Sequence, residues 1–278
     1  MPPPLVVAVI HSLFRYSQKL VILMKIVTWN LNSIRARLER FTEWLAENSP
    51  DVLLLQETKC EEHAFPKEAI EDLGYNVVIH GQKTFNGVAI LSKYPIEDLQ
   101  CGLPTYTEDP QARYIEAVTN GVRVASVYIP NGQDVGTEKY AYKLSFLERL
   151  RQHLAHTLQY EEAFVIGGDY NIAPTDLDVA DPKAWHEEIL CSTAERKAFN
   201  ALLNLGYRDA FRIDHPAEKI YSWWDYRSQA WPKNEGLRID HLLLSPQATD
   251  RLEITGIDRT PRGKEKASDH APVWCLIG

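Results

Sequence analysis

Short apolar runs separated by polar turns recur from Met24 to the C-terminus of the chain. Each run spans a few residues, and many are rich in Val, Ile, Tyr and Trp, which is typical of β-strands. So many short strands must form sheets whose apolar faces are covered by another layer. Strands are expected at 25–30, 51–57, 75–80, 87–92, 113–119, 122–129, 163–169, 221–226, 238–244 and 271–276.

Helical spacing of apolar residues predicts helices at 34–47, at 138–158 and near 195–204. Two packed sheets with helices outside would accommodate all of these elements, which makes the chain α/β. No internal repeat, low-complexity tract or obvious linker interrupts the sequence from Met24 onward. We therefore predict one domain over residues 24–278.

The first 23 residues follow a different pattern. Their apolar run at 5–10 is ended by His11 and Ser12, so it is far shorter than the ~20 residues that a membrane span needs. No Lys or Arg precedes Arg15, which argues against a secretory signal. We expect no membrane partner and a cytoplasmic location. Residues 1–23 are assigned no function, as a loose extension or an upstream mis-start.

Composition and cysteine spacing narrow the class of protein. The 278 residues are 45% hydrophobic and 24% charged, which excludes collagen, coiled coil and wholesale disorder. The cysteines are far apart without a C-x-x-C pair, which argues against zinc ribbons and disulfide frameworks and favours a reducing compartment. All four are predicted to be buried packing residues, namely Cys60, Cys101, Cys191 and Cys275.

The net charge of −8, from 30 basic and 38 acidic residues, at first sight disfavours a nucleic-acid partner. Carboxylates in a metal site add negative charge that the bound cation cancels, so the net charge decides little. Basic residues are concentrated at 259–266, a stretch that taken alone is most simply a solvated loop.

Several apolar runs end in acidic, amide or phenolic residues. A strand that leaves the core with a carboxylate at its tip is costly unless the charge has a partner. Tips gathered along one sheet edge would concentrate carboxylates in one cleft, and a divalent cation is their natural partner. A single polar tip is more often a solvated strand end, but their joint occurrence favours a site. The tips are Asn30, Glu57, Tyr128, Asp169, Asn171, Asp240, Asp269 and His270.

In order and spacing, the motifs around these residues resemble the bacterial exonuclease III family of the endonuclease/exonuclease/phosphatase superfamily. The resemblance extends from Met24 to the C-terminus. It implies a four-layer α/β sandwich, with two mixed, mainly antiparallel sheets packed face to face and helices outside. The motifs are Trp-Asn30, Leu-Gln-Glu57-Thr-Lys59, Tyr128-Ile-Pro-Asn-Gly132, Gly-Gly-Asp169-Tyr-Asn171, Trp223-Trp-Asp-Tyr-Arg227, Gly-Leu-Arg-Ile-Asp240 and Ser-Asp269-His270-Ala-Pro.

The resemblance also implies an activity, that of a metal-dependent DNA-repair nuclease. Such an enzyme cuts the phosphodiester 5′ to an abasic site, trims the 3′ ends of duplex DNA and leaves a 3′-hydroxyl. We expect it to act as a monomer on double-stranded DNA. Two alternatives stay open: a phosphatase of the same fold that acts on phosphoinositides or sphingomyelin, and a DNA-binding scaffold without activity. The Trp223 and Asp240 motifs favour DNA, and the complete set of polar tips argues against a scaffold.

Oxygen donors without a Cys or His cage select a hard cation, so Mg²⁺ is expected, with Mn²⁺ as a substitute. Glu57 is the best ligand, because a fully apolar run precedes it. Asp169 and Asn171 stand two apart, which in an extended chain puts both side chains on one face, although an Asx turn is an alternative. The further candidate ligands are Asn30, Asp169, Asn171, Asp269 and His270.

The roles in catalysis follow from the resemblance. Asp169 would position and deprotonate the water, and Asn171 would hold the phosphate or the water. Neighbours in an extended segment point to opposite sides, so Asp240 is a better partner for His270 than Asp269 is. The paired imidazole would contact a phosphate oxygen. Tyr128 would offer its phenol to the phosphate, although a strand tyrosine can equally pack in the core.

The remaining candidates concern the substrate. An apolar pocket can admit a flipped deoxyribose that lacks a base and exclude an intact nucleoside. The resemblance assigns its wall to Trp223, Leu237 and Ile239, with Trp224 as support, although paired tryptophans usually belong to the core. Arg113 is expected to contact the DNA backbone, or otherwise to be a surface charge on a strand.

Overall fold

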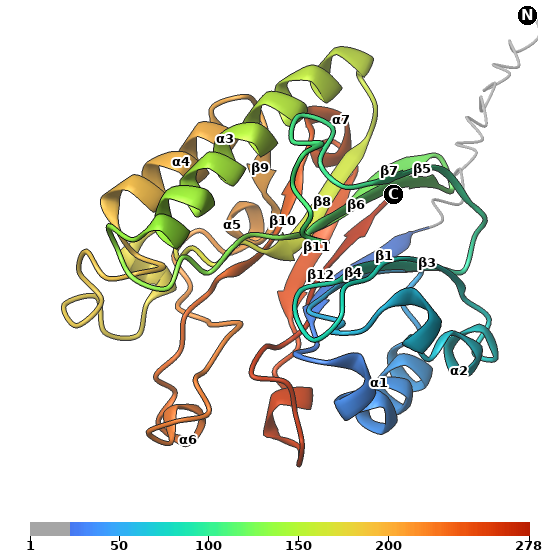
Figure 1. Ribbon diagram of the computed structural model, residues 1–278, viewed down its shortest axis with the longest axis horizontal. Coiled ribbons are helices and arrows are strands. Elements are labelled where there is room, and N and C mark those ends of the chain that lie inside the picture. The colour runs from blue at the N-terminus through green and yellow to red at the C-terminus, as the bar shows by residue number, and fades with distance from the viewer. Residues whose placement is uncertain (1–22) are drawn as a thin grey trace, which may run out of the picture.

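The computed structural model describes residues 23–278, and two six-stranded sheets form its centre (Figure 1). Sheet A has the strand order β11-β12-β1-β2-β4-β3, and sheet B has the order β5-β6-β7-β8-β10-β9. The strands of sheet A are β1 (Met24–Asn30), β2 (Val52–Gln56), β3 (Asn76–His80), β4 (Val88–Ser92), β11 (Leu252–Ile257) and β12 (Val273–Ile277). Those of sheet B are β5 (Ile96–Cys101), β6 (Tyr114–Thr119), β7 (Val122–Tyr128), β8 (Phe164–Asp169), β9 (Arg208–Asp209) and β10 (Asp240–Leu244).

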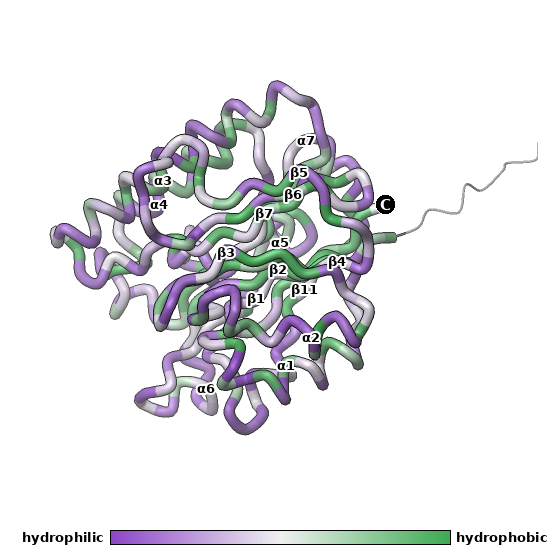
Figure 2. The backbone as a smooth tube through the Cα atoms, turned by 45° about the vertical axis from the view of Figure 1, so that its right-hand side comes forward, coloured by the Kyte–Doolittle hydropathy of each residue, from purple (hydrophilic) through white to green (hydrophobic). Residues whose placement is uncertain are grey.

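The central strands are buried on both faces, which is why they read as continuous apolar runs. Alternate residues point to opposite sides of a strand. In β2, Val52 and Leu54 therefore pack between the two sheets, whereas Leu53 and Leu55 pack against the outer helices. Figure 2 shows this pattern as hydrophobic strands in the centre and hydrophilic segments around them. The predicted four-layer sandwich is confirmed.

Helices cover the outer face of each sheet. The helices on sheet A are α1 (Ile34–Asn48) and α2 (Lys67–Glu71), and α3 (Glu138–Thr157) and α4 (Thr193–Leu203) lie on sheet B. Ser33 caps α1 by accepting a bond from the Ala36 N–H, and Ser192 and Glu195 form a capping box at α4. The short helices are α5 (Ala210–Asp214), α6 (Ala230–Lys233) and α7 (Pro246–Thr249), with 3₁₀ turns η1 (Glu62–Ala64), η2 (Leu158–Tyr160), η3 (Asp176–Asp178) and η4 (Pro261–Gly263).

Several expectations need correction. Residues 221–226 form no strand, because Trp223 makes only isolated bridges to Leu237 and His270. The sequence analysis missed β5, β9 and β11, and β5 and β11 are edge strands with irregular register and few buried residues. Cys101 is exposed at the end of β5, while the other cysteines are buried as predicted.

Two expectations about the chain as a whole remain predictions. The proposed extension at 1–23 lies, apart from Leu23, outside the described residues, and the assignment of 24–278 to one domain is untested. No helix within residues 23–278 is both long enough and apolar enough to cross a membrane.

Candidate active site

The polar tips of both sheets meet in one place. Asn30 ends β1 and Glu57 directly follows β2 in sheet A, while Tyr128 and Asp169 end β7 and β8 in sheet B. The expectation of a single sheet edge is therefore wrong. Asp240 begins a strand rather than ending one, because β10 runs antiparallel to β8 and its first residue pairs with Asp169.

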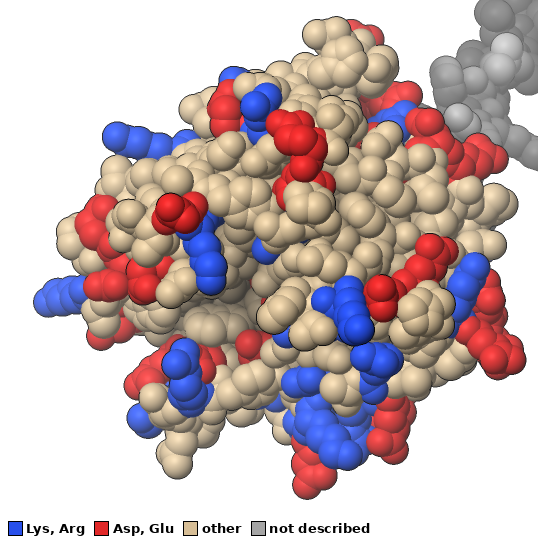
Figure 3. All heavy atoms as spheres, viewed as in Figure 1, with Lys and Arg blue, Asp and Glu red and all other residues tan. Residues whose placement is uncertain are grey.

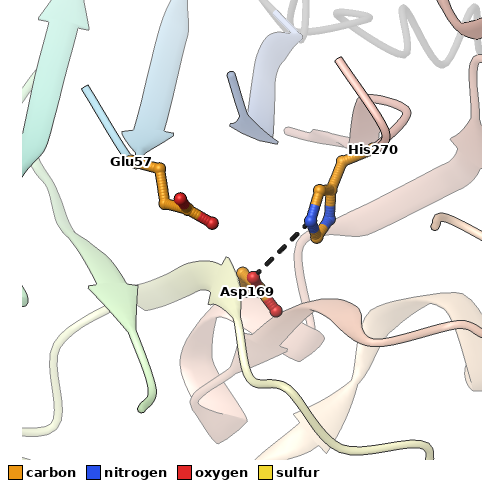
Figure 4. Close-up of side chains that lie close together, drawn as sticks. All are labelled: Glu57, Asp169 and His270. Atoms are coloured by element: carbon orange, nitrogen blue, oxygen red, sulfur yellow. Dashed lines mark ion pairs between the residues drawn. The ribbon is translucent and has the colours of Figure 1, made fainter. Parts of the chain in front are cut away.

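Two carboxylates and one imidazole form the centre of the site. Ligand atoms of Glu57, Asp169 and His270 all lie within 4.8 Å of one another (Figure 4). The Asn30 amide donates to Glu57 Oε1 at 2.8 Å and to Asp169 Oδ2 at 2.9 Å. The carboxylate oxygens of Glu57 and Asp169, held at this spacing, are donors that fit a hard divalent cation. Asn30 presents its N–H groups to them and so aligns the carboxylates in this geometry.

Asp169 and Asn171 lie together, but not because the chain is extended. Asn171 has φ +50°, in the left-handed region, and its main-chain N–H donates to Asp169 Oδ1 at 2.9 Å. This is the Asx turn that the sequence left open. The Asn171 amide donates to Asp169 Oδ2 at 3.2 Å, and Tyr170 turns away into the core as expected.

The predicted pairing of His270 with Asp240 is present. His270 Nδ1 lies 2.9 Å from Asp240 Oδ2 and 3.1 Å from Oδ1. The Ser222 hydroxyl donates to Asp240 Oδ2 at 2.6 Å. The sequence analysis did not identify this residue. Burial alone would lower the pKa of His270, but the charges of Asp240 and Asp169 outweigh it and raise that pKa to about 10. The imidazole is therefore cationic at neutral pH.

Burial also shapes the protonation of Asp169. Its removal from water raises the pKa of its carboxyl well above the ordinary range, and His270, 3.8 Å away, only partly opposes this. The nearby charges of Asp240 and Glu57 raise it further. A carboxyl whose pKa is shifted toward neutrality is suited to accept a proton from water.

Tyr128 reaches the site from the end of β7. Burial, together with the charges of Glu57 and Asp169, raises the pKa of its phenol well above 10, so the hydroxyl remains a donor. The Arg113 guanidinium lies 4.8 Å from the centre of the Tyr128 ring and donates to the Tyr128 carbonyl at 3.3 Å. Arg113 is only 9% exposed, so it is not a free surface charge. Arg113 therefore packs against the Tyr128 ring and binds its main-chain oxygen.

Asp269 is held by a different set of donors from Asp240, the partner of the neighbouring His270. Its carboxylate accepts bonds from Asn32 Nδ2 at 2.9 Å and from Trp223 Nε1 at 3.0 Å. Burial would raise the pKa of Asp269, but His270 and these donors lower it. Lys59 joins the same edge, with its ammonium 2.6 Å from Asn32 Oδ1 and 2.7 Å from Glu57 Oε2.

The three residues predicted to line a sugar pocket lie in one apolar cluster. Leu237 and Ile239 are each 1% exposed, and Trp223 packs against them while it remains partly exposed. Trp223 is therefore the partly exposed member of this cluster, and the two aliphatic side chains are its buried neighbours. Trp224 is fully buried in a different cluster, with Tyr221, Ala230 and Ala271.

The sequence analysis missed two functional candidates, Lys143 and Ser222, and only Lys143 had a signal in the sequence. Lys143 follows Tyr140 by three positions and precedes Leu147 by four, so it is a charged residue on the apolar stripe of α3. Its ammonium donates to the main-chain oxygen of Asn171. Ser222 had no comparable signal, because only the folded chain brings it to Asp240.

The surface around the site is hollowed between the α3–α4 side and the α6 loop (Figure 3). Lys and Arg side chains gather along its lower border, over α1 and the loop that precedes β12. Within residues 259–266, Lys264 and Lys266 are exposed, whereas Arg262 is buried against Trp231 and Tyr226. A cleft rich in carboxylates thus has cationic side chains beside it.

A known protein family matches most of the chain. The model of the endonuclease/exonuclease/phosphatase family matches residues 27–270. The chain belongs to this family.

Individual relatives are similar over nearly their whole length. Exodeoxyribonuclease III of Haemophilus influenzae is 38% identical over 263 residues, which cover 90% of this chain and 98% of the relative. A Neisseria 3′ phosphatase, NExo, solved with a product DNA hairpin, is 42% identical with a TM-score of 0.90, covering 92% of this chain and 99% of that one. An AP endonuclease from Archaeoglobus fulgidus is 39% identical with a TM-score of 0.88, over 91% and 99% of the two chains.

Proposed function

We propose that this chain is a metal-dependent DNA-repair nuclease. It hydrolyses the phosphodiester 5′ to abasic sites and removes nucleotides and blocking groups from 3′ ends of duplex DNA, leaving a 3′-hydroxyl. The observation that carries the proposal is the cleft in which Asp169, a buried carboxylate with a raised pKa, lies 3.8 Å from a cationic His270. A base for water and a cation for phosphate thus lie side by side.

The names of the relatives support the choice of substrate. They include an exodeoxyribonuclease, a 3′ phosphatase solved with DNA and an AP endonuclease. The cationic side chains along the cleft border fit a polyanion better than the net charge of −8 suggests. We propose that the enzyme binds double-stranded DNA as a monomer.

Mg²⁺ is the proposed cofactor, with Mn²⁺ as a substitute, because the donors are oxygens. Glu57 would hold the ion, with Asp169 or Asp269 completing the carboxylate set. A bound ion supplies charge neutralisation on the phosphate oxygens. His270 is assigned to the phosphate rather than to the metal, because a protonated imidazole has no free lone pair.

The side chains then divide the reaction between them. Asp169 accepts the proton of the attacking water, and the Asn171 amide holds the water or a phosphate oxygen. The His270 imidazolium, fixed by Asp240, donates to a non-bridging oxygen where negative charge develops. Tyr128 donates its phenolic hydrogen to the same phosphate. Trp223 forms the exposed wall that receives an abasic sugar.

The test uses a duplex with one tetrahydrofuran abasic analogue, incubated with Mg²⁺ or with EDTA. A matched duplex with an ordinary nucleotide at that position and a duplex with a 3′-phosphate complete the set. We expect incision 5′ to the analogue and release of the 3′-phosphate, both abolished by EDTA. Asp169→Asn keeps the shape but removes the proton acceptor, so it should lower both rates by ~10²–10⁴-fold.

Two results would contradict the proposal. One is the absence of cleavage of either DNA in both Mg²⁺ and Mn²⁺. The other is cleavage that Asp169→Asn leaves unchanged, which would point to a contaminating nuclease. Hydrolysis of a phosphoinositide with no action on DNA would favour the phosphatase alternative.

A further inference from the structure

A lysine lies buried beside the cleft. The side chain of Lys143 on α3 and that of its partner, Glu195 on α4, are each 0% exposed. Burial lowers the pKa of Lys143, and the Glu195 carboxylate opposes that shift. A buried ion pair is weak evidence for stability, because apolar residues of similar size are often as stable in its place. The position of this pair therefore suggests another role.

The ammonium group has three N–H donors, and three segments supply one acceptor each. The acceptors are the Glu195 carboxylate, the main-chain oxygen of Asn171 at 2.6 Å and the main-chain oxygen of Asn131 at 3.1 Å. Asn171 follows β8 and Asn131 follows β7. Lys143 Nζ binds the carbonyls of both Asn131 and Asn171. It therefore fixes the separation of the two loops that follow β7 and β8.

The loops need such an anchor. Asn171 adopts φ +50°, which a residue with a side chain adopts at a cost, and its side chain must still face Asp169. The Asn131 amide donates to Asn171 Oδ1 at 3.2 Å, so the two loops also touch directly. At Gly132, which has φ +93°, an added Cβ would lie 3.1 Å from Lys143 Cδ. The lysine stem is thus packed against the loop whose carbonyl it binds.

Glu195 extends the anchor to the apolar side of the cleft. Its carboxylate accepts bonds from the Leu190 N–H at 3.1 Å and from the Ser192 N–H at 3.0 Å. Leu190 belongs to the cluster that contains Leu237 and Ile239 behind Trp223. One buried ion pair therefore joins the loop of Asn171 to the wall of the cleft.

We propose that Lys143 and Glu195 form a positioning pair that holds Asn171 and the loop 130–132 in the geometry that the reaction requires. The pair touches neither substrate nor metal and acts through Asn171. This inference rests on the proposed nuclease function, and it predicts a defect in the chemical step rather than in DNA binding.

Two variants test the pair against a matched control. Lys143→Met combined with Glu195→Gln removes both charges, so no buried charge is left without a partner. Lys143→Arg keeps the charge, but a planar guanidinium cannot direct three N–H groups at acceptors that converge on one nitrogen. The control is Glu116→Gln. Glu116 is a buried carboxylate on β6 that also binds α3, through His153, and its other partners, Tyr114 and Arg123, are not candidate site residues.

Single-turnover cleavage of the abasic duplex and KM are measured well below each variant's Tm. We expect both test variants to lose at least ~10-fold in single-turnover rate, about the effect of losing one net hydrogen bond to a charged group, with KM changed less than ~3-fold. Glu116→Gln should keep the wild-type rate although its Tm falls. Wild-type rates in Lys143→Arg and in the double variant, or an equal loss in the control, would overturn the proposal.

A readout without substrate separates this proposal from the proposed function. If the wild-type protein cleaves no DNA, the nuclease proposal fails, and the side-chain ¹⁵N–¹H resonances of Asn171 still report on the pair. We expect these resonances to shift or broaden in Lys143→Arg and to stay in place in Glu116→Gln. Unchanged resonances in Lys143→Arg would refute the positioning role on their own.

Discussion

Replacement of Asp240 by Asn should disable His270 without disturbing the fold. Both oxygens of Asp240 face His270 Nδ1, at 2.9 and 3.1 Å, and neither residue is more than 4% exposed. Asn has the same shape, so Ser222 keeps a partner and the imidazole keeps an acceptor. The substitution removes the charge that the imidazolium faces.

The size of the effect follows from this geometry. A hydrogen bond to a charged group contributes about 1.5–3 kcal/mol, and each 1.4 kcal/mol changes a rate tenfold. The loss of the charged bond in the transition state should therefore lower turnover by roughly 10- to 100-fold. Asp169 remains 3.8 Å from His270 Nε2, and its charge keeps the loss from being greater.

A double-mutant cycle provides the assay. Single-turnover incision is measured for the wild-type protein, Asp240→Asn, His270→Asn and the double variant. If Asp240 acts through His270, the double variant should be no slower than His270→Asn within about twofold, because the interaction is already lost. Asp209→Asn is the matched control, since Asp209 is a buried carboxylate 3.6 Å from the other histidine of this region, His241.

Additive losses in the cycle would refute the reasoning, since they would mean that Asp240 serves the reaction independently of His270. A comparable loss in Asp209→Asn would also refute it, because that residue lies outside the cleft. In that case the effect would reflect the removal of any buried carboxylate.

Three further changes test other parts of the molecule. Glu57→Ala should abolish tight use of Mg²⁺ and lower turnover by at least ~10²-fold, measured as rate against Mg²⁺ concentration; a wild-type rate at limiting Mg²⁺ would exclude Glu57 as a ligand. Trp223→Ala should reduce abasic incision roughly tenfold more than release of a 3′-phosphate, on the scale of a stacking contact of ~1–3 kcal/mol, and equal losses would make Trp223 a structural residue. Arg238→Gln should cost about 3–5 kcal/mol of unfolding free energy at pH 7, because it leaves Asp209 buried without its arginine and Asp178 with Arg212 alone. Burial raises the pKa of both carboxyls, but Arg238, with Arg212 at Asp178 and His241 at Asp209, outweighs it and lowers both pKa values. The stability that the carboxylates contribute is therefore present above the unfolded pKa of ~3.9 and is lost as the pH falls through the lower folded values. Denaturant titrations at pH 7 and at a pH well below ~3.9 should therefore show a smaller difference between variant and wild type at the lower pH, and an unchanged difference would contradict this assignment.

The sequence predicted the central strands and the polar residues at their ends. Strands such as β2 are buried on both faces, so their apolar runs are continuous and stop abruptly at Gln56 and Glu57. The edge strands β5 and β11 could not be found this way, because most of their residues are exposed or only partly buried and their apolar residues form no continuous run. Cys101 was misjudged for the same reason, since it ends β5 at that exposed edge.

The membership of the site was easier to predict than its geometry. The motifs brought Glu57, Asp169 and His270 together correctly, but spacing along the chain suggested an extended segment where Asn171 is in a left-handed turn. Ser222 and Asn131 act through contacts between residues distant in sequence, which no local pattern encodes. Lys143 was visible as a charge on an apolar helix face, but its acceptors were not.

Contacts between the two sheets determine how far apart Glu57 and Asp169 lie. The parallel pairs β1–β2 and β7–β8 end at the same side of the molecule, each bringing polar residues to the junction between the sheets. There the sheets approach closely, since a Cβ on Gly167 would lie 2.6 Å from Leu54 Cδ1. The Gln56 amide donates to Ser126 Oγ at 2.9 Å, and that hydroxyl donates to the Leu55 carbonyl at 2.7 Å. Because Gln56 precedes Glu57 and Gly167 shortly precedes Asp169, these small and polar contacts, rather than the surface loops, fix the separation of the two carboxylates.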